Sequence, residues 1–263
     1  MKNNYTIITG GGGFLAYYFA EAILEERKNL YLVDINRVNL KKNKNKLEKV
    51  FNTEVKTDFV DVTNLDSIKK FIKKNRNIFF DNLINNASKD FKVGKKIGSN
   101  FKDLSDITLK EWNQGIDSNL TSYFLVSKEF GKIMKKNNYG NIINISSELS
   151  VIAPDHRIYN NGKKIKYYKP VTYSVCKHGI VGLTKYIASS WSNHNIRCNS
   201  ISPGSVYHKN HNKFFLKEVS KRIPLSRLAN PKELKDSIKF LISKNNSFYT
   251  GQNMVIDGGR SII

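Results

Sequence analysis

Short runs of apolar and β-branched residues alternate along the chain with longer segments in which apolar residues recur every three or four positions. The runs have the length and composition of buried strands, and the longer segments have the spacing of amphipathic helices. We expect strands at residues 5–9, 30–34, 54–60, 82–85, 141–146, 197–202 and 254–256. We expect helices at about residues 14–27, 64–75, 109–137, 173–193 and 231–243.

This alternation of strand and helix predicts an α/β fold: a doubly wound parallel sheet of the Rossmann type, with three layers. Parallel strands need crossover connections, and right-handed crossovers place helices on both faces of the sheet. The length of 263 residues is compatible with one domain over residues 1–263, since α/β proteins of this size often stay undivided. Ligands of such sheets bind beyond the carboxyl ends of the strands, so the candidate chemistry is sought there.

A glycine-rich turn links the first expected strand to the first expected helix. Residues 9–16 read Thr-Gly-Gly-Gly-Gly-Phe-Leu-Ala. Glycines permit a tight turn in which backbone amides approach a pyrophosphate, and the N-terminus of the helix favours its negative charge. Gly10, Gly13, Phe14 and Leu15 are therefore candidates for binding a dinucleotide. The alternative is a plain turn between a strand and a helix.

An acidic residue, Asp34, ends the second expected strand. A carboxylate there can accept hydrogen bonds from the adenosine ribose hydroxyls and repels a 2′-phosphate. NAD is therefore favoured over NADP as the cofactor, while the nearby Arg37 keeps NADP possible. The alternative for Asp34 is the N-cap of a helix.

Polar residues also follow the third and fourth expected strands. Asp61 and Val62 come after the third strand, and Asn86 and Ala87 come after the fourth. Asp61 could hydrogen-bond an adenine amine, which would place this pair beside the cofactor. Alternatively, Asp61 caps the helix expected from about Asn64.

Tyr173 and Lys177 lie four residues apart at the start of a long expected helix, so their side chains share one helical face. A free tyrosine has a pKa of about 10 and is a poor base at neutral pH. A neighbouring ammonium group favours the phenolate, which makes Tyr173 a candidate general acid/base. The spacing is common in proteins, and taken alone it would also fit an ordinary pair on a helix surface.

Two further polar residues could assist this pair. Ser147 lies at the carboxyl end of the expected strand 141–146, where its hydroxyl could hydrogen-bond a substrate oxygen. Asn119 lies within the expected helix 109–137, although asparagine is a poor helix former. It could hold a water molecule that links the lysine to solvent. The alternative for Asn119 is a buried amide bonded to the backbone.

Together these residues resemble the motifs of the short-chain dehydrogenase/reductase family, in the family's order and along essentially the whole chain. The matching motifs are Thr9-Gly10 with Gly13, Asp61, Asn85-Asn86-Ala87, Asn119, Ser147, Tyr173 with Lys177, Pro203-Gly204 and Asp257-Gly258-Gly259. The resemblance implies that Tyr173 is the catalytic acid/base and that Lys177 lowers its pKa and contacts the nicotinamide ribose. It also implies that Ser147 orients the substrate oxygen and that Asn119 supports a proton relay.

The same resemblance implies how the nicotinamide is held and how chains associate. The loop 201–206, with Pro203, Gly204 and Val206, would cradle the nicotinamide end of the cofactor. Members of the family pair their long helices, here near 109–137 and 173–193, so a homodimer or homotetramer is expected.

The chain departs from the family pattern in three places: the glycine spacing, Ser88 in place of the usual small Gly or Ala, and the distance from Ser147 to Tyr173. The glycine spacing, with Gly10, Gly13 and Ala16, is more like the extended, sugar-nucleotide branch, whereas the length and the C-terminal motif match the single-domain branch. The distance from Ser147 to Tyr173 is longer than is usual. We expect residues 148–172 to be an active-site insertion and residues 205–224 to be a substrate lid. Phrases in the insertion resemble a subgroup associated with flagellin modification and bacterial surface-sugar biosynthesis.

The insertion is rich in cations and tyrosines. These are Arg157, Tyr159, Lys163, Lys164, Lys166, Tyr167, Tyr168 and Lys169. Such side chains could bind a phosphate or carboxylate and stack on a sugar, which suggests an anionic sugar derivative as the substrate. A solvated flap is the alternative. His208 and His211 lack a third ligand nearby in the sequence, so we predict no metal site.

The formal net charge of +22 is spread over nearly every segment. It indicates a lysine-rich composition more than a basic recognition surface, so we expect no specific nucleic-acid partner. The sequence shows no signal-peptide pattern and no apolar stretch long enough to span a bilayer. Two cysteines are too few for a disulfide framework or a zinc site. We therefore expect a cytoplasmic protein with no membrane partner.

Three functions remain open at this point. The first is an NAD(P)-dependent oxidoreductase that transfers a hydride between nicotinamide and a sugar-type alcohol or ketone in surface-glycan or flagellin-glycan biosynthesis. The second is a dehydrogenase or reductase of an unrelated small substrate, such as a 3-oxoacyl thioester or a polyol. The third is a non-catalytic Rossmann scaffold that binds nucleic acid. The presence of Asn119, Ser147, Tyr173 and Lys177 together argues against the third.

Overall fold

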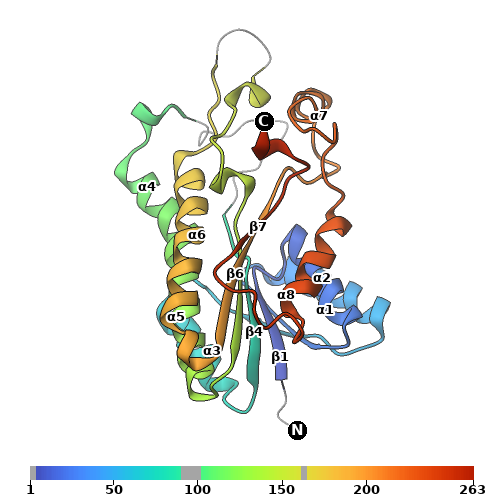
Figure 1. The fold of residues 1–263 in the computed structure, drawn as a ribbon, viewed down its shortest axis with the longest axis vertical. Coiled ribbons are helices and arrows are strands. Elements are labelled where there is room, and N and C mark those ends of the chain that lie inside the picture. Colours follow the sequence, from blue (N-terminus) through green and yellow to red (C-terminus); the bar gives the residue numbers. More distant parts are fainter. Residues whose placement is uncertain (1–3, 90–101, 161–164) are drawn as a thin grey trace.

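The computed structural model describes residues 4–89, 102–160 and 165–263, and its centre is one sheet of seven parallel strands (Figure 1). The strands are β1 Asn4–Thr9, β2 Asn29–Asp34, β3 Lys56–Phe59, β4 Phe79–Asn85, β5 Gly140–Ile145, β6 Ile196–Pro203 and β7 Asn253–Ile256. Their order in the sheet is β3-β2-β1-β4-β5-β6-β7. All seven predicted strands are confirmed, and the order reverses between β1 and β4, which is where ligands of such sheets bind.

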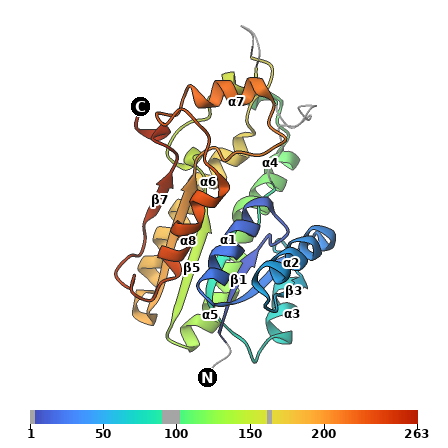
Figure 2. The same ribbon diagram turned by 90° about the vertical axis from the view of Figure 1, so that its right-hand side faces the viewer.

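Helices cover both faces of this sheet, as predicted for a three-layer fold. They are α1 Phe14–Glu25, α2 Arg37–Phe51, α3 Leu65–Lys74, α4 Leu109–Ile116, α5 Ser122–Lys136, α6 Val171–Ser190, α7 Lys213–Ser220 and α8 Lys235–Ile242. Both views show α1, α2 and α8 on one face and α3, α5 and α6 on the other (Figures 1 and 2). In the described part of the chain, no helix is long and apolar enough to cross a bilayer.

Two buried hydrophobic clusters hold these layers together. Side chains of a strand alternate between faces, so Ile8 packs into the cluster under α1 and α8 while Ile7 packs into the cluster under α3 and α5. Ile143 and Ile142 on β5 divide in the same way. Apolar side chains therefore leave the central strands on both sides, as a doubly wound sheet requires.

The helical pattern differs from expectation in three places. Helix α2 was not predicted, because its lysine- and asparagine-rich sequence buries only Leu40, Asn43 and Leu47. Helix α7, inside the expected lid, was not predicted either. The expected helix 109–137 is interrupted by a π-helical turn at Asp117–Thr121. The N-cap of α2 is Asn36, whose side chain accepts from the amide of Asn39; Asp34 does not cap this helix.

The segment before α6 and the segment around α7 pack against each other beyond the carboxyl end of the sheet (Figure 2). Ile158 joins Val219, Ile223 and Leu228 in a third small hydrophobic cluster. Two ion pairs add to it, because Asp155 accepts hydrogen bonds from both Arg157 and Arg222. The expected insertion and the expected lid thus contact each other directly.

The C-terminal turn is tied to the end of β5 by a buried ion pair. Arg260 Nη1 lies 2.6 Å from Glu148 Oε1, and both side chains are about 6% exposed. Gly258 and Gly259 have φ values of +68° and +90°, so this turn needs glycine before Arg260. The pair joins residues 112 positions apart and holds the chain terminus beside Ser147.

We predict that Arg260→Met lowers the free energy of unfolding by about 3–5 kcal/mol, because it leaves the Glu148 carboxylate buried without its charge partner. Urea unfolding followed by circular dichroism would measure this change. Lys132→Met is the matched control, since Lys132 also pairs with a buried glutamate, Glu129, but its own side chain is 60% exposed. The control should cost no more than about 1 kcal/mol. Equal losses in the two variants would contradict the prediction.

Candidate active site

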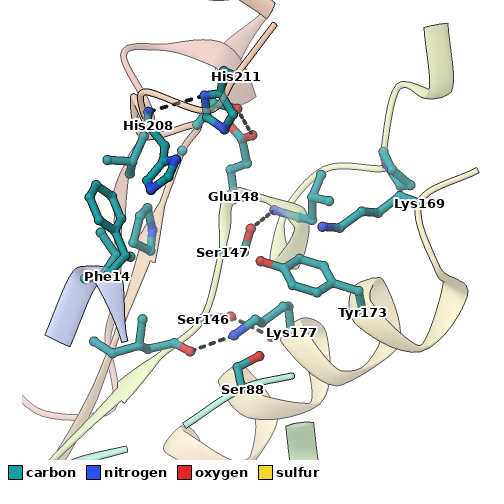
Figure 3. A pocket seen from close by; sticks show the side chains of 18 of the residues that line it. Phe14, Ser88, Ser146, Ser147, Glu148, Lys169, Tyr173, Lys177, His208 and His211 are labelled. Carbon is teal, nitrogen blue, oxygen red and sulfur yellow. Dashed lines mark hydrogen bonds between the residues drawn. The ribbon is translucent and has the colours of Figure 1, made fainter. Parts of the chain in front are cut away.

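A cavity of about 550 Å³ lies at the carboxyl end of the sheet. Its walls come from the glycine turn, the end of β5, the segment before α6, the first turns of α6 and the loop after β6 (Figure 3). The predicted site residues that line it are Gly13, Phe14, Leu15, Asn86, Ser147, Tyr173, Lys177, Pro203, Gly204 and Val206. Most of the predicted cofactor and catalytic residues therefore meet in one place, although they come from distant parts of the sequence.

The glycine turn has the shape that a dinucleotide needs. Gly10 has a φ of +66°, and a Cβ atom there would lie 2.7 Å from Cα of Ala87. A Cβ on Gly12 would lie 2.9 Å from the backbone nitrogen of Leu40. Gly13 is the N-cap of α1 and provides no side-chain cap, so the first turn of the helix presents backbone amides to an anion. The residues present fit a bound pyrophosphate.

Hydrogen bonds hold this turn against the end of β4. The side chain of Asn86 donates to the carbonyl oxygens of Thr9 and Gly10, at 3.1 and 3.3 Å. The amides of Asn86 and Ala87 both donate to Thr9 Oγ1. Ala87 and Gly10 are thus structural partners at the switch point, and Asn86 also faces the cavity.

Asp34 lies at the end of β2 beside the glycine turn. Its Oδ2 accepts from the amide of Gly12 at 2.8 Å, and its Oδ1 accepts from the amide of Asn36 at 2.7 Å. Asp34 is outside the lining of the described cavity, which covers the other end of the site. Its carboxylate is fixed at the adenosine end of the expected cofactor path.

Asp61 and Val62 are also outside the lining of this cavity. Asp61 Oδ1 accepts from the amide and the hydroxyl of Thr63, and its own amide donates to Ser67 Oγ. The N-cap of α3 is Asn64, so Asp61 does not cap the helix directly. Val62 packs against the hydrophobic cluster under α3.

Tyr173 and Lys177 lie on the first turns of α6 and face the cavity (Figure 3). Lys177 is 3% exposed, and its ammonium group donates to the carbonyl oxygen of Ile145 at 3.0 Å. Lys177 Nζ lies 5.4 Å from the ring centroid of Tyr173. The Ile145 oxygen also accepts from the hydroxyl of Tyr123 at 2.9 Å. The end of β5 therefore fixes the lysine beside the tyrosine.

Ser147 and Ser146 lie at the junction of β5 with the next turn. Figure 3 shows the hydroxyls of Ser147 and Tyr173 turned toward the same part of the cavity. Ser147 Oγ accepts from the amide of Leu149 at 3.3 Å, so the serine also caps the short helix that follows. Ser146 Oγ donates to the backbone carbonyl of Lys177 at 2.8 Å, which ties α6 to the same strand end.

Asn119 is 2% exposed and lies in the π-helical turn between α4 and α5. Its Oδ1 accepts from Ser88 Oγ at 2.6 Å and from the amide of Lys89 at 2.8 Å, and its Nδ2 donates to the carbonyl of Gly115. Asn119 is outside the lining of the cavity, but Ser88 is part of it. The structure thus connects Asn119 to the site through Ser88.

The cations of the expected insertion do not all face the cavity. Lys169 lines it, and its ammonium group lies 3.9 Å from the ring centroid of Tyr173. Arg157 is 73% exposed and forms a bidentate pair with Asp155, and Lys166 is outside the lining. Lys163 and Lys164 lie outside the described residues.

Of the tyrosines expected in the insertion, one lines the cavity and two do not. Tyr159 lines the cavity and stacks on Phe215, with 6.0 Å between the ring centroids. Tyr167 is 38% exposed, and Tyr168 packs edge-to-face against His156. Neither of these two rings lines the cavity.

His208 and His211 line the cavity on the side of the loop after β6. The ring of His208 packs against Phe14, and the ring of His211 packs against Phe215. Burial lowers the pKa of His211, which favours its neutral form. Across residues 4–89, 102–160 and 165–263, no group of three or more His, Cys, Asp or Glu side chains is placed to hold a metal ion.

The Glu148–Arg260 pair also lines the cavity and was not predicted from the sequence. Burial raises the pKa of Glu148 to about 7, although Arg260 opposes this shift. Glu148 Oε2 is buried and lacks a hydrogen-bond partner among the described residues. The only indication in the sequence was an acidic residue directly after Ser147 in an otherwise uncharged stretch, since charged residues are seldom buried without a partner.

Comparisons with known proteins agree with this geometry. A family model described as "Enoyl-(Acyl carrier protein) reductase" matches residues 14–261. The chain is 28% identical to the post-translational flagellin modification protein A of Campylobacter coli, over 98% of each chain. It is 28% identical to an NAD-dependent glycerol dehydrogenase of Listeria innocua, over 100% of this chain and 95% of that protein.

Solved structures share the fold as well. A short-chain dehydrogenase from Leptospira borgpetersenii with bound NAD⁺ matches with a TM-score of 0.82 and 28% identity, covering 99% of this chain and 94% of that one. The family match over residues 14–261 includes Ser147, Tyr173 and Lys177 and begins directly after the glycine turn. The chain belongs to the short-chain dehydrogenase/reductase family and is an NAD(P)-dependent oxidoreductase.

Proposed function

We propose that the protein transfers a hydride between NAD and an alcohol or ketone group of an anionic sugar derivative, in the biosynthesis of a bacterial surface glycan or flagellin glycan. One observation carries the catalytic part of this proposal. Ser147, Tyr173 and Lys177 line one cavity together with the glycine turn, and the carbonyl of Ile145 holds the lysine beside the tyrosine.

In the proposed oxidation, the Tyr173 phenolate takes the proton of the substrate hydroxyl while Ser147 donates a hydrogen bond to the same oxygen. The glycine turn and the loop after β6 would hold the cofactor, which would supply the acceptor for the hydride that the alcohol carbon loses. The carbon–oxygen single bond becomes the double bond of the ketone. Reduction runs through the same contacts in reverse. Lys177 favours the phenolate by its positive charge. Ser147 and Tyr173 thus orient the oxygen and move its proton, the two tasks that acid–base catalysis needs.

We propose that Asn119 supports this chemistry by position. Its amide holds Ser88 Oγ and the amide of Lys89, and Ser88 forms part of the cavity wall. The asparagine belongs to a π-helical turn, a distortion that is common at functional sites. A proton leaving Lys177 would pass this polar wall on its way to solvent.

NAD is the proposed cofactor in preference to NADP. Asp34 presents a fixed carboxylate at the end of β2, where a 2′-phosphate would meet negative charge. The Listeria innocua relative is named as NAD-dependent, and the Leptospira borgpetersenii structure holds NAD⁺. Asp61 and Val62, at the end of the neighbouring strand, would flank the adenine.

The anionic sugar rests on different observations. Lys169 brings a positive charge into the cavity beside the proposed catalytic tyrosine, and Tyr159 offers a ring for stacking on a sugar. The Campylobacter coli relative is named for flagellin modification. Two other substrates compete with the anionic sugar. A 3-oxoacyl thioester is supported by the description of the family model, and a polyol is supported by the glycerol dehydrogenase relative.

A substrate panel separates these candidates. Sugar phosphates, nucleotide sugars, glycerol and an acetoacetyl thioester would be compared by absorbance of the reduced nicotinamide. The proposed setting is cytoplasmic, where NAD and activated sugars are available.

We also propose a homodimer or homotetramer. Phe124 on α5 and Tyr186 on α6 are 48% and 70% exposed, so the long helices carry apolar surface that a second copy would cover. The molar mass in solution, measured by light scattering, would decide between one, two and four chains.

Residues 148–160 and 165–172, from the expected insertion, are proposed to cover the substrate together with residues 205–224, the expected lid. Their contact rests on the cluster around Ile158 and on Asp155, which pairs with both arginines. Hydrogen bonds from Arg157 and Arg222 lower the pKa of Asp155 well below its usual range. The carboxylate therefore stays charged and keeps the two segments in contact at neutral pH.

We predict that Tyr173→Phe lowers kcat by about 10²- to 10⁴-fold, because the substrate oxygen loses its proton donor and acceptor. Binding of NADH, followed by fluorescence, should be unchanged. Tyr167→Phe is the matched control and should keep full activity, since Tyr167 does not line the cavity. A fully active Tyr173→Phe enzyme would reject the assigned acid/base, and a wild-type protein without any nicotinamide binding would reject the proposed function.

The cofactor preference gives a second prediction. Asp34→Asn should reduce the preference for NADH over NADPH by about tenfold, equivalent to about 1.4 kcal/mol, because the negative charge facing the 2′-phosphate is removed. Fluorescence titration of both cofactors measures the ratio of the two dissociation constants. Asp66→Asn, on the exposed side of α3, controls for the loss of one negative charge. Tighter binding of NADPH than of NADH by the wild-type protein would overturn the assignment.

The proposed cover gives a third prediction. Arg222→Met should raise KM for the substrate by roughly 5- to 30-fold while kcat changes little. This corresponds to the loss of about 1–2 kcal/mol of substrate-binding free energy, because the two covering segments are no longer held together. Arg157→Met is a matched control, because Arg157 pairs with the same carboxylate but is 73% exposed. Steady-state kinetics with the active panel member would measure both. The proposal fails if the two variants behave alike.

A further inference from the structure

Two ammonium groups, not one, approach the ring of Tyr173. Lys169 Nζ lies 3.9 Å from the ring centroid, and Lys177 Nζ lies 5.4 Å from it. Figure 3 shows Lys169 reaching toward the ring from the segment before α6, whereas Lys177 approaches from the helix itself. The second cation therefore belongs to residues 148–172, the part of the chain that departs from the family pattern.

Lys169 is held in this position by its own segment. Its backbone amide donates to Nδ1 of His156 at 3.1 Å. Burial lowers the pKa of His156, which keeps Nδ1 available as an acceptor at neutral pH. On the other side, Pro170 is the N-cap of α6, and its carbonyl oxygen accepts from the amide of Tyr173. The backbone around Lys169 is thus fixed to the same helix that carries the tyrosine.

We infer that Lys169 is a positioning residue for the proposed hydride transfer, sharing with Lys177 the stabilisation of the Tyr173 phenolate. This inference rests on the proposed function, because it matters only if Tyr173 exchanges the proton. A positive charge near a titrating group favours the anionic form, and the effect grows as the charge approaches. A cation over the face of an aromatic ring is also attracted by the ring itself.

The other ionisable groups near the tyrosine do not cancel this effect. Burial raises the pKa of Tyr123, which keeps that phenol neutral behind Lys177. The two acidic residues of the cavity wall are each paired with arginine: Glu148 with Arg260, and Asp155 with Arg157 and Arg222. His156 is favoured in its neutral form. Among the described residues, the two lysines are therefore the charges that act most directly on the ring.

The test is a titration of the Tyr173 phenolate in the protein without substrate. Phenolate absorbance would be recorded against pH for the wild type and for Lys169→Met, each measured against its own Tyr173→Phe counterpart. The difference isolates one tyrosine from the rest. We expect the midpoint to rise by about one pH unit in Lys169→Met, because one of two neighbouring cations is lost. Lys169→Arg should restore most of the shift.

Lys166→Met is the matched control, since Lys166 belongs to the same segment but does not line the cavity. It should leave the midpoint unchanged. The kcat/KM–pH profile of Lys169→Met should move by the same amount as the absorbance titration, because both report on the free enzyme. An unchanged midpoint in Lys169→Met overturns the inference, and so does an increase in KM alone, which would make Lys169 a contact for the anionic group of the substrate.

The outcomes for the inference and for the proposed function remain distinct. If the wild type binds NADH and loses turnover in Tyr173→Phe, the function stands even when Lys169→Met titrates like the wild type. If the wild type binds no nicotinamide cofactor, the proposed function fails whatever the titration shows.

Discussion

The site depends on one buried ammonium group. Lys177 is almost fully enclosed, and an ammonium group removed from water is costly unless strong acceptors surround it. The carbonyl of Ile145, at the end of β5, supplies such an acceptor. The same carbonyl accepts a hydrogen bond from Tyr123, and Ser147 lies two residues further along the chain. The contact between Lys177 and Ile145 therefore fixes the position of α6 along its axis relative to the end of β5. The positions of Tyr173 and Ser147 relative to each other follow from it.

Beneath this contact, buried asparagine, serine and threonine side chains form hydrogen bonds between the strands and helices. Asn85 on β4 donates to Asn144 on β5, and Asn144 donates to Thr184 on α6. Asn85 also donates to Ser127 on α5. Each of these bonds joins two different elements, so a slip between them would leave buried donors without partners, at a cost of about 1–3 kcal/mol for each. The asparagine-rich composition is thus used to align the strands and helices below the site.

The sheet and the main site were predictable from sequence because they follow from local patterns. Buried strands are continuous apolar runs, and their carboxyl ends meet at one edge, so Gly13, Ser147 and Pro203 could be placed together without coordinates. Helix α2 was not predicted, because its few buried positions are separated by many lysine and asparagine residues, which obscure the helical pattern. The Glu148–Arg260 pair could not be predicted for a different reason. It joins residues far apart in the chain, and no local pattern states which of many charged residues will be buried together.

In the proposed function, the insertion would link substrate covering and acid–base chemistry in one segment. Asp155 fixes it to the helix α7 region through Arg222, and Lys169, 14 positions later in the chain, lies over the ring of Tyr173. A substrate that displaced the proposed cover would therefore also act on the position of a charge beside the proposed catalytic phenol. An anionic group entering the cavity would attract Lys169 and weaken its hold on the ring. The charge of the substrate and the proton affinity of Tyr173 would then be coupled through the side chain of Lys169. A family member without this lysine would lack the coupling.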